Sequence, residues 1–416
     1  MKVNLILICC FLALFDASAA LRAGVAVRQV TPDPLLPVIG GIGSGQPVTR
    51  KEGELTVRAL VVEEGANRVA IVSADFLGFP SVLGNKVRAA VPEIPPSNIL
   101  IGATHTHSAP DCYGFPDEMG GTSSDPKYLA SVCRKMAEAI HEALAGLQPV
   151  KLRVATGEAR GKIAYNYYAE QLYDPRCNVM QFLSLSGQPL ATLVNYAIHP
   201  EVLGDHAGVC SPDLIGPLYE RIEQHGGGTG IFMNSAQGGM VTADNRLAGG
   251  GEARTWPECQ RIGNLLADQA LLIIRDAPVQ SSPELFCAAR MVSFPVDSPL
   301  MRALMSRMPG FDSSGAASVK VQLNLVNLGT AQILTIPGEA LPNIGYYLKR
   351  KMRGQNDFLF GLTNDAYGYI LTKEDFDSFK RYAYVTRTSL GERTCEVLEQ
   401  AALELVNSSP VPGRAE

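Results

Sequence analysis

The sequence predicts a protein of the α/β class, with a mixed β-sheet at its core and helices packed on that sheet. Segments with the apolar pattern of strands are interspersed with amphipathic segments of helical period. Their order is not a strict alternation of strand and helix, so we expect a mixed sheet rather than a parallel one. The chain has 416 residues, of which 46% are hydrophobic, and such a chain can bury a large core.

The first half of the chain supplies strands and one long helix. The segment "LTVRALVVEEGANRVAIVSADF" predicts two strands joined by a turn at residues 65–67, because β-branched residues flank a turn-forming cluster. Residues 126–148 carry apolar side chains at helical spacing, which predicts a helix. The helix should end near Gly146, and Pro149 follows as a helix breaker. The next run, "VKLRVATGEA", is typical of a strand.

The second half combines hairpins with helices. Residues 179–200 predict one hairpin, and residues 321–340 predict another that turns at Gly329. Helical patterns cover about 213–225 and 258–275, with the strand-like run "GIFMNSAQGG" between them. The tail "SLGERTCEVLEQAALELV" predicts a last helix.

The chain begins with the pattern of a secretory signal peptide. One lysine precedes an apolar stretch of roughly a dozen residues, too short for a membrane span, and small residues follow up to Ala20. We therefore expect residues 1–20 to be removed and the protein to be secreted or periplasmic. No linker divides the remainder, so residues 21–416 are expected to form one domain.

Composition excludes some partners and cofactors. The formal net charge is −5 and no block of Lys and Arg is present, so we expect no nucleic-acid partner. Two of the nine cysteines lie in the signal peptide, and the other seven are scattered without a Cys-x-x-Cys pair. An odd number leaves at least one thiol unpaired, and this pattern disfavours a cysteine-ligated zinc site.

Four strand-like runs end in polar clusters: "THTH" with His105 and His107, "YAIH" with His199, "NSAQGG", and "PGE" with Glu339. Strand ends held by a rigid sheet are where α/β enzymes place their chemistry. His105 and His107 share one face of an extended segment, because side chains repeat every second residue. Two histidines and a carboxylate form a catalytic zinc set, although a hydrogen-bonded structural pair of histidines is the competing interpretation.

Four motifs, in this order, resemble the catalytic domain of neutral, non-lysosomal ceramidases: "GATHTHSAP", "NYAIHPEVLGDHAGVCSPD", "IPGEA" and "GLTNDAYGYILTKEDF". These enzymes are zinc amidases that cut the N-acyl bond of ceramide. The resemblance runs from about Leu21 to the C-terminal helix and implies a ceramidase-like catalytic domain, Zn²⁺ and a lipid N-acyl substrate with peripheral contact at a membrane. Because the chain ends after the catalytic region, we expect no C-terminal β-sandwich domain.

The resemblance also implies roles for single residues. Zinc would be held by His105, His199, Glu339 and Tyr369, with Tyr367 as the competing tyrosine. The remaining histidines outside the "THTH" cluster are expected at the surface or at a helix end: His141, His206 and His225.

Three further residues have implied roles in the reaction. His107 would act as general acid or base for zinc-bound water, and Tyr382 would hydrogen-bond the scissile amide, with Tyr384 as its alternative. Asp213 would orient His107, or it belongs to an ordinary helix N-terminus in which Ser211 is the N-cap.

The resemblance breaks at the family's nucleophilic serine. The corresponding stretch, "QGGMVTADN", has no serine there, and Thr242 is the nearest hydroxyl. We favour zinc-activated water as the attacking group, with Gly238, Gly239 or Thr242 as donors to the oxyanion. The family's substrate arginine also has no clear match, because Asn166 and Tyr167 stand where the family has an Asn-Arg pair, and Arg176 is offset in sequence.

The sequence therefore predicts a zinc-dependent amidohydrolase that cleaves an N-acyl amide bond. Two alternatives stay open: an amidase or esterase for another acylated compound, and a metal-containing binding protein that has lost catalysis.

Overall fold

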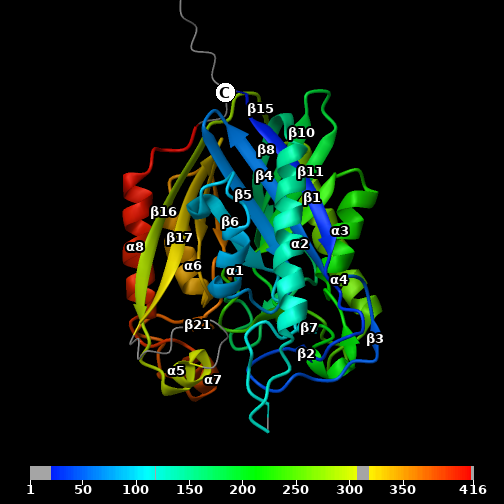
Figure 1. Ribbon diagram of the computed structural model, residues 1–416, viewed down its shortest axis with the longest axis vertical. Helices are drawn as coiled ribbons and strands as arrows, with labels where there is room; N and C mark the ends of the chain where they lie inside the picture. The colour runs from blue at the N-terminus through cyan, green and yellow to red at the C-terminus, as the bar shows by residue number, and fades with distance from the viewer. Residues whose placement is uncertain (1–19, 118, 307–317, 414–416) are drawn as a thin grey trace, which may run out of the picture.

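The computed structural model describes residues 20–117, 119–306 and 318–413. Two β-sheets pack face to face, and helices cover the outer face of each sheet (Figure 1). This arrangement confirms the predicted α/β class with mixed sheets. The expected signal peptide falls on residues 1–20, and residues 1–19 of it lie outside the described residues.

The larger sheet has nine strands, and both predicted hairpins in it are confirmed. Its strands are β1 (Arg22–Gln29), β4 (Thr56–Glu64), β5 (Asn67–Ala74), β6 (Ile99–Ala103), β8 (Gln148–Glu158), β10 (Arg176–Ser184), β11 (Pro189–Tyr196), β13 (Thr229–Asn234) and β15 (Val279–Gln280). Their order is β13-β11-β10-β8-β1-β4-β5-β6, with β15 beside β8. The pairs β5–β6 and β11–β13 are parallel and the other pairs are antiparallel.

The smaller sheet has four strands in the order β16-β17-β18-β20. They are β16 (Leu285–Pro295), β17 (Ser318–Leu328), β18 (Ala331–Thr335) and β20 (Asn356–Phe360). The two sheets share one apolar core, in which Met180 and Phe182 of β10 belong to the same cluster as Ile333 and Phe358. Burial of this apolar surface from both sides holds the sheets together.

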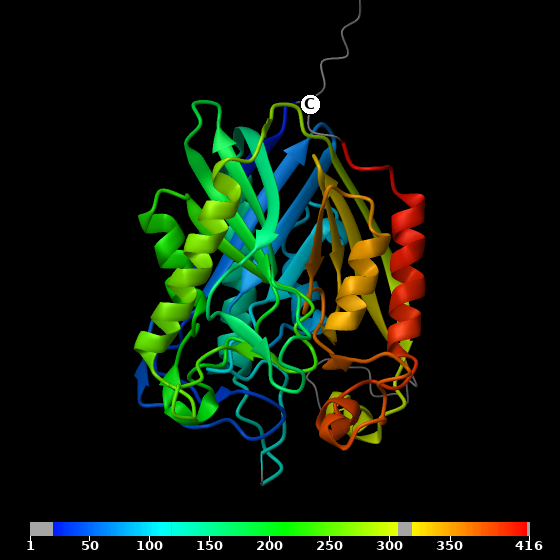
Figure 2. The same ribbon diagram turned by 180° about the vertical axis from the view of Figure 1, so that it is seen from behind.

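Helices complete four layers (Figure 2). They are α1 (Ser81–Ala89), α2 (Pro126–Ala145), α3 (Ile215–Gln224), α4 (Trp256–Arg275), α5 (Pro299–Met305), α6 (Pro342–Lys351), α7 (Ala383–Arg387) and α8 (Thr394–Ser408). Helices α2, α3 and α4 pack on the larger sheet, and α6 and α8 pack on the smaller one. Within the described part of the chain, no helix has the length and apolar character needed to cross a membrane.

Short elements line the end of the sandwich at which the site lies. The strands are β2 (Val38–Ile39), β3 (Arg50–Lys51), β7 (Ala109–Pro110), β9 (Ala164–Asn166), β12 (Val209–Cys210), β14 (Val241–Ala243), β19 (Glu339–Ala340) and β21 (Tyr369–Ile370). The 3₁₀ helices η2 (Asp205–Ala207) and η3 (Lys380–Tyr382) belong to this end as well, whereas η1 (Pro96–Asn98) precedes β6 at its opposite end.

The side-chain amide of Asn234 joins the ends of three strands. Its Nδ2 donates to Thr104 O (3.0 Å) after β6 and to Ile198 O (2.7 Å) after β11. Its Oδ1 accepts from the backbone nitrogens of Ile198 (3.3 Å) and Ser235 (2.9 Å). The two outer strands of the larger sheet, β6 and β13, therefore meet, and the polar clusters that follow them lie side by side.

A buried ion pair links the layers. Lys349 on α6 places Nζ 2.8 Å from Asp174 Oδ2, and the other oxygen of Asp174 accepts from Arg176 Nε at 2.7 Å. The side chains of Lys349 and Asp174 are both almost fully buried. Asp174 precedes β10 of the larger sheet, so this pair connects that sheet to the helix layer of the smaller one.

The seven cysteines among the described residues are all free, and six of them are buried. Burial raises the pKa of Cys177 and that of Cys210 to about 12. These thiols therefore stay protonated and serve as small apolar side chains in the core.

We predict that Asp174→Ala lowers the free energy of unfolding by about 3 kcal/mol, because it leaves the Lys349 ammonium buried without its partner. Urea denaturation followed by circular dichroism measures this loss. The matched control is Asp268→Ala, which removes the partly exposed pair with Arg221 and should change stability by about 1 kcal/mol or less. Equal small losses in both variants would contradict the prediction.

The partly buried carboxyl group of Asp357 on β20 should make the free energy of unfolding depend on pH. Burial raises its pKa to about 6, from an ordinary value of 3.8. Above that pH the folded protein holds a charged, partly buried carboxylate that the unfolded chain hydrates better. We therefore expect Asp357→Asn to match the wild type near pH 4 and to be about 1 kcal/mol more stable near pH 7.5. A stability difference that is the same at both pH values would refute the charge argument.

Candidate metal centre

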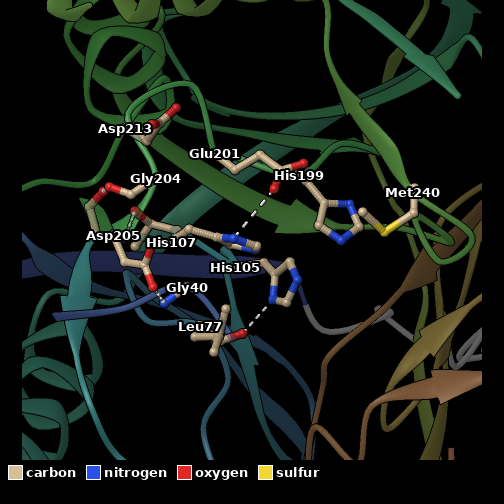
Figure 3. A network of polar contacts seen from close by, with 12 residues as sticks. Gly40, Leu77, His105, His107, His199, Glu201, Gly204, Asp205, Asp213 and Met240 are labelled. Atoms are coloured by element: carbon tan, nitrogen blue, oxygen red, sulfur yellow. Dashed lines mark hydrogen bonds and ion pairs between the residues drawn. The ribbon is translucent and has the colours of Figure 1, made fainter. Parts of the chain in front are cut away.

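Three imidazoles meet at the end of the sandwich (Figure 3). His105 and His107 follow β6, His199 follows β11, and one ring nitrogen of each lies within 4.8 Å of the others. The sequence predicted that His105 and His107 lie together because they share one face of an extended segment, and this reason is wrong. His105 has a φ of 75°, so the segment is not extended there but turns through a left-handed residue. Such a strained conformation in a histidine is typical of a functional site.

Glu339 completes the set with an oxygen from the other side of the sandwich. Its Oε2 lies 3.1 Å from His199 Nε2 and 3.4 Å from His105 Nε2. Ligand atoms in a tetrahedral zinc site with bonds of about 2.0 Å are about 3.3 Å apart, so these spacings fit zinc. Burial opposes ionisation of Glu339, but His105 and His199 together hold its pKa well below the usual value.

The other ring nitrogens are held by the protein. His105 Nδ1 lies 2.5 Å from Leu77 O, and His199 Nδ1 lies 2.8 Å from Val241 O. A carbonyl oxygen only accepts, so both rings carry their proton on Nδ1 and turn the lone pair of Nε2 inward. His107 Nε2 is buried and has no hydrogen-bond partner among the described residues, so its lone pair or proton is available within the cluster. The donor set and the unpaired nitrogen fit a bound metal ion.

Tyr369 lies closer to this set than Tyr367. Tyr369 on β21 is the register partner of Glu339 on β19, and its hydroxyl donates to Met240 Sδ at 3.5 Å. Burial raises the pKa of Tyr369, and the nearby charge of Glu339 raises it further. The Tyr367 hydroxyl instead interacts with Asp365. The geometry therefore favours the predicted tyrosine over its competitor.

The loop without the family serine passes under Glu339. A Cβ on Gly238 would lie 2.2 Å from Glu339 O, so only glycine fits at this position. The N–H of Gly238 donates to Ala340 O at 2.9 Å, so it is not free to serve as an oxyanion donor as predicted. Gly239 and Met240 both have a φ of 68°, and this left-handed turn brings the thioether of Met240 to Tyr369.

Asp213 does not contact His107. Its oxygens accept from the backbone nitrogens of Leu203 (2.8 Å) and Leu214 (2.7 Å), and burial raises its pKa to about 6. Asp213 therefore holds its own loop, ahead of helix α3. The carboxylate that faces His107 is Glu201, whose Oε2 lies 3.4 Å from Nδ1 (Figure 3). Sequence reasoning missed Glu201, although it lies within the quoted motif "NYAIHPEVLGDHAGVCSPD", because nothing in the motif shows which residue its side chain faces.

The remaining histidines lie outside the cluster. The side chain of His206 is 80% exposed, and His141 lies at the surface of α2 near Glu93. His225 is the C-cap of α3, as predicted.

An apolar cavity of about 700 Å³, including its open mouth, reaches this centre. His105, His107 and Glu339 line it together with apolar walls that include Leu77, Tyr113, Phe115, Met301 and Leu304. An apolar cavity with a few convergent polar groups is the usual form of a ligand site.

Among the described residues that line the cavity is Tyr384, and Tyr382 is not among them. Tyr382 packs against Tyr168 and Phe379, with ring centroids 5.5 and 5.4 Å away. The structure therefore favours the alternative, Tyr384, for contact with a substrate. Thr242, on β14 opposite Tyr165, is also absent from the described lining.

The chain resembles known proteins in part of its sequence and in its fold. No family model matches the chain. A relative named neutral ceramidase B, from Dictyostelium discoideum, is 27% identical over 168 residues, which cover 34% of this chain and 23% of the relative. The crystal structure of neutral ceramidase from Pseudomonas aeruginosa matches 96% of this chain with a TM-score of 0.77 and 18% identity.

A solved structure described as ceramidase complexed with C2 matches equally well, with a TM-score of 0.78 and 19% identity. The chain covers 76% and 77% of these two solved chains. The resemblance read from the motifs is thus confirmed: this chain is similar in sequence to a neutral ceramidase over part of its length and has the neutral ceramidase fold over nearly all of it.

Proposed function

We propose that this protein is a metal-dependent amidohydrolase that cleaves an N-acyl amide bond, as ceramidases do. One observation supports this most strongly. Two imidazoles and a carboxylate stand at the spacing of zinc ligands, and two of these three groups, His105 and Glu339, line an apolar cavity. The neutral ceramidase fold supports the choice of an amide over other bonds.

His105, His199 and Glu339 would hold the metal, with Tyr369 beside them. Bound zinc would supply Lewis-acid chemistry, which polarises a carbonyl and lowers the pKa of water. We give the ion as zinc because imidazole nitrogens with one carboxylate are a common catalytic zinc set.

The protein's own groups would orient the substrate and move the proton. The apolar walls would take up an acyl chain and exclude water from the reacting carbonyl. His107 Nε2, unpaired and directed into the cluster, would accept a proton from the attacking water and return it to the leaving nitrogen. The Tyr384 hydroxyl would donate a hydrogen bond to the oxyanion, the task that the sequence assigned to Tyr382.

We further propose water rather than Thr242 as the nucleophile. Thr242 is not among the described lining residues, whereas His107 faces the cavity. A lipid substrate would bring the mouth to a membrane surface, where the partly exposed rings of Phe379 (54%) and Tyr384 (39%) could contact it. On the pattern of residues 1–20, we place the enzyme, residues 21–416, outside the cytoplasm.

Metal content tests the proposed ligands. We expect about one zinc per chain in the wild type, because the described residues bring together one such donor set, and almost none in His105→Ala. The matched control is His206→Ala, which removes an exposed histidine and should keep its zinc. Elemental analysis of the purified, dialysed proteins gives the answer. Full zinc content in His105→Ala would refute the site.

Hydrolysis of a fluorogenic N-acylsphingosine tests the reaction. We expect release of the fatty acid, its loss after chelation and its return on addition of zinc, because polarisation of the carbonyl depends on the metal. Thr242→Val should keep activity within about threefold, because the hydroxyl is not required when water attacks.

The outcomes separate the alternatives. Turnover of other N-acyl or O-acyl compounds alone would favour the broader amidase or esterase. Zinc-loaded protein that binds such lipids without turnover would indicate a binding protein.

A further inference from the structure

The three histidines of the cluster share one arrangement. In each ring Nδ1 faces an oxygen of the protein: Leu77 O for His105, Val241 O for His199 and Glu201 Oε2 for His107. Two of these acceptors are backbone carbonyls that the fold fixes in place. The third is a side chain, so the ring of His107 depends on one replaceable group.

The backbone aims Glu201 at His107. The N–H of His107 donates to Pro200 O at 3.1 Å, and the N–H of Glu201 donates to His199 O at 3.1 Å. The first bond fastens the loop after β11 to the segment after β6, and the second closes a turn within that loop. The two side chains consequently start from neighbouring points and converge (Figure 3).

Glu201 has no competing cation among the described residues. Its only ion pair within ranges 20–117, 119–306 and 318–413 is the one with His107, and its side chain is 24% exposed. The neighbouring acids are engaged elsewhere: Asp213 accepts from Leu203 and Leu214, and Asp205 accepts from Gly40 N at 3.1 Å. Of these three carboxylates, only Glu201 is available to the ring.

We propose that Glu201 is a positioning residue for His107. It accepts the Nδ1 proton and so holds the tautomer whose Nε2 lone pair points into the cluster. The separation of 3.4 Å is long for a hydrogen bond, and contacts of this kind often shorten in a loaded site. The proposal rests on the proposed function for the task of His107, but the tautomer itself does not depend on any substrate.

The spectroscopic test uses zinc-loaded protein with ¹⁵N-labelled histidine. The chain has six histidines, and His107→Gln assigns the ring signals. We expect the ¹⁵N shifts of the Nδ1–H tautomer for His107 in the wild type. Glu201→Ala should shift the signals toward the Nε2–H tautomer, because no acceptor then faces Nδ1, and Glu201→Gln should keep the wild-type pattern through its amide oxygen. Unchanged shifts in Glu201→Ala would overturn the proposal.

Kinetics give a second readout. We expect kcat to fall about 10- to 100-fold in Glu201→Ala, with KM nearly unchanged and with partial rescue in Glu201→Gln, as for other groups that orient a working histidine. The control is Glu220→Ala, on the exposed face of α3, with unchanged kcat and thermal stability. Loss of zinc or of thermal stability in both Glu201 variants would show a structural role and contradict the proposal. A protein without turnover would disprove the function, while the ring shifts would still decide the role of Glu201.

Discussion

The side-chain amide of Asn234 is the interaction on which the site depends. Its four hydrogen bonds join the chain just before His105, just before His199 and just after β13. An amide can do this because it donates and accepts at once, and a carboxylate or an aliphatic side chain of the same size cannot. The distances of 3.1 and 3.4 Å between Glu339 and the two imidazoles therefore depend on Asn234, which is not itself one of the proposed metal ligands.

A second asparagine, Asn195, links the strands of the larger sheet to the smaller sheet. Asn195 Nδ2 donates to the carbonyl oxygens of Met233, Asn234 and Leu359, and Leu359 belongs to β20. The histidines come from the larger sheet, whereas Glu339 and Tyr369 follow strands of the smaller one. The site is thus built across the interface of two sheets, and its precision depends on their packing rather than on either sheet alone.

Apolar runs on either side of turn-forming residues predicted the hairpins β4–β5, β10–β11 and β17–β18, whose strands are mostly buried on both faces. Apolar side chains at helical spacing predicted the helices α2, α4 and α8, which bury one face. The motifs pointed to His105, His199 and Glu339, which the structure brings together. The roles of Glu201, Tyr384 and Asp213 could not be predicted in the same way. Each role depends on where an irregular loop folds back, and such loops carry no periodic pattern. The positive φ of His105 could not be predicted either, because histidine usually adopts a negative φ.

Seven free cysteines, six of them buried, make the folding of this protein sensitive to oxidants. In the native state the seven thiols of the described residues are free, and burial keeps the protons on the sulfurs. In the unfolded chain all seven would be accessible together, and any disulfide among them would be non-native. The two-sheet core must therefore form faster than the thiols are oxidised. Refolding should need a reducing solution, whereas the folded protein should not need one.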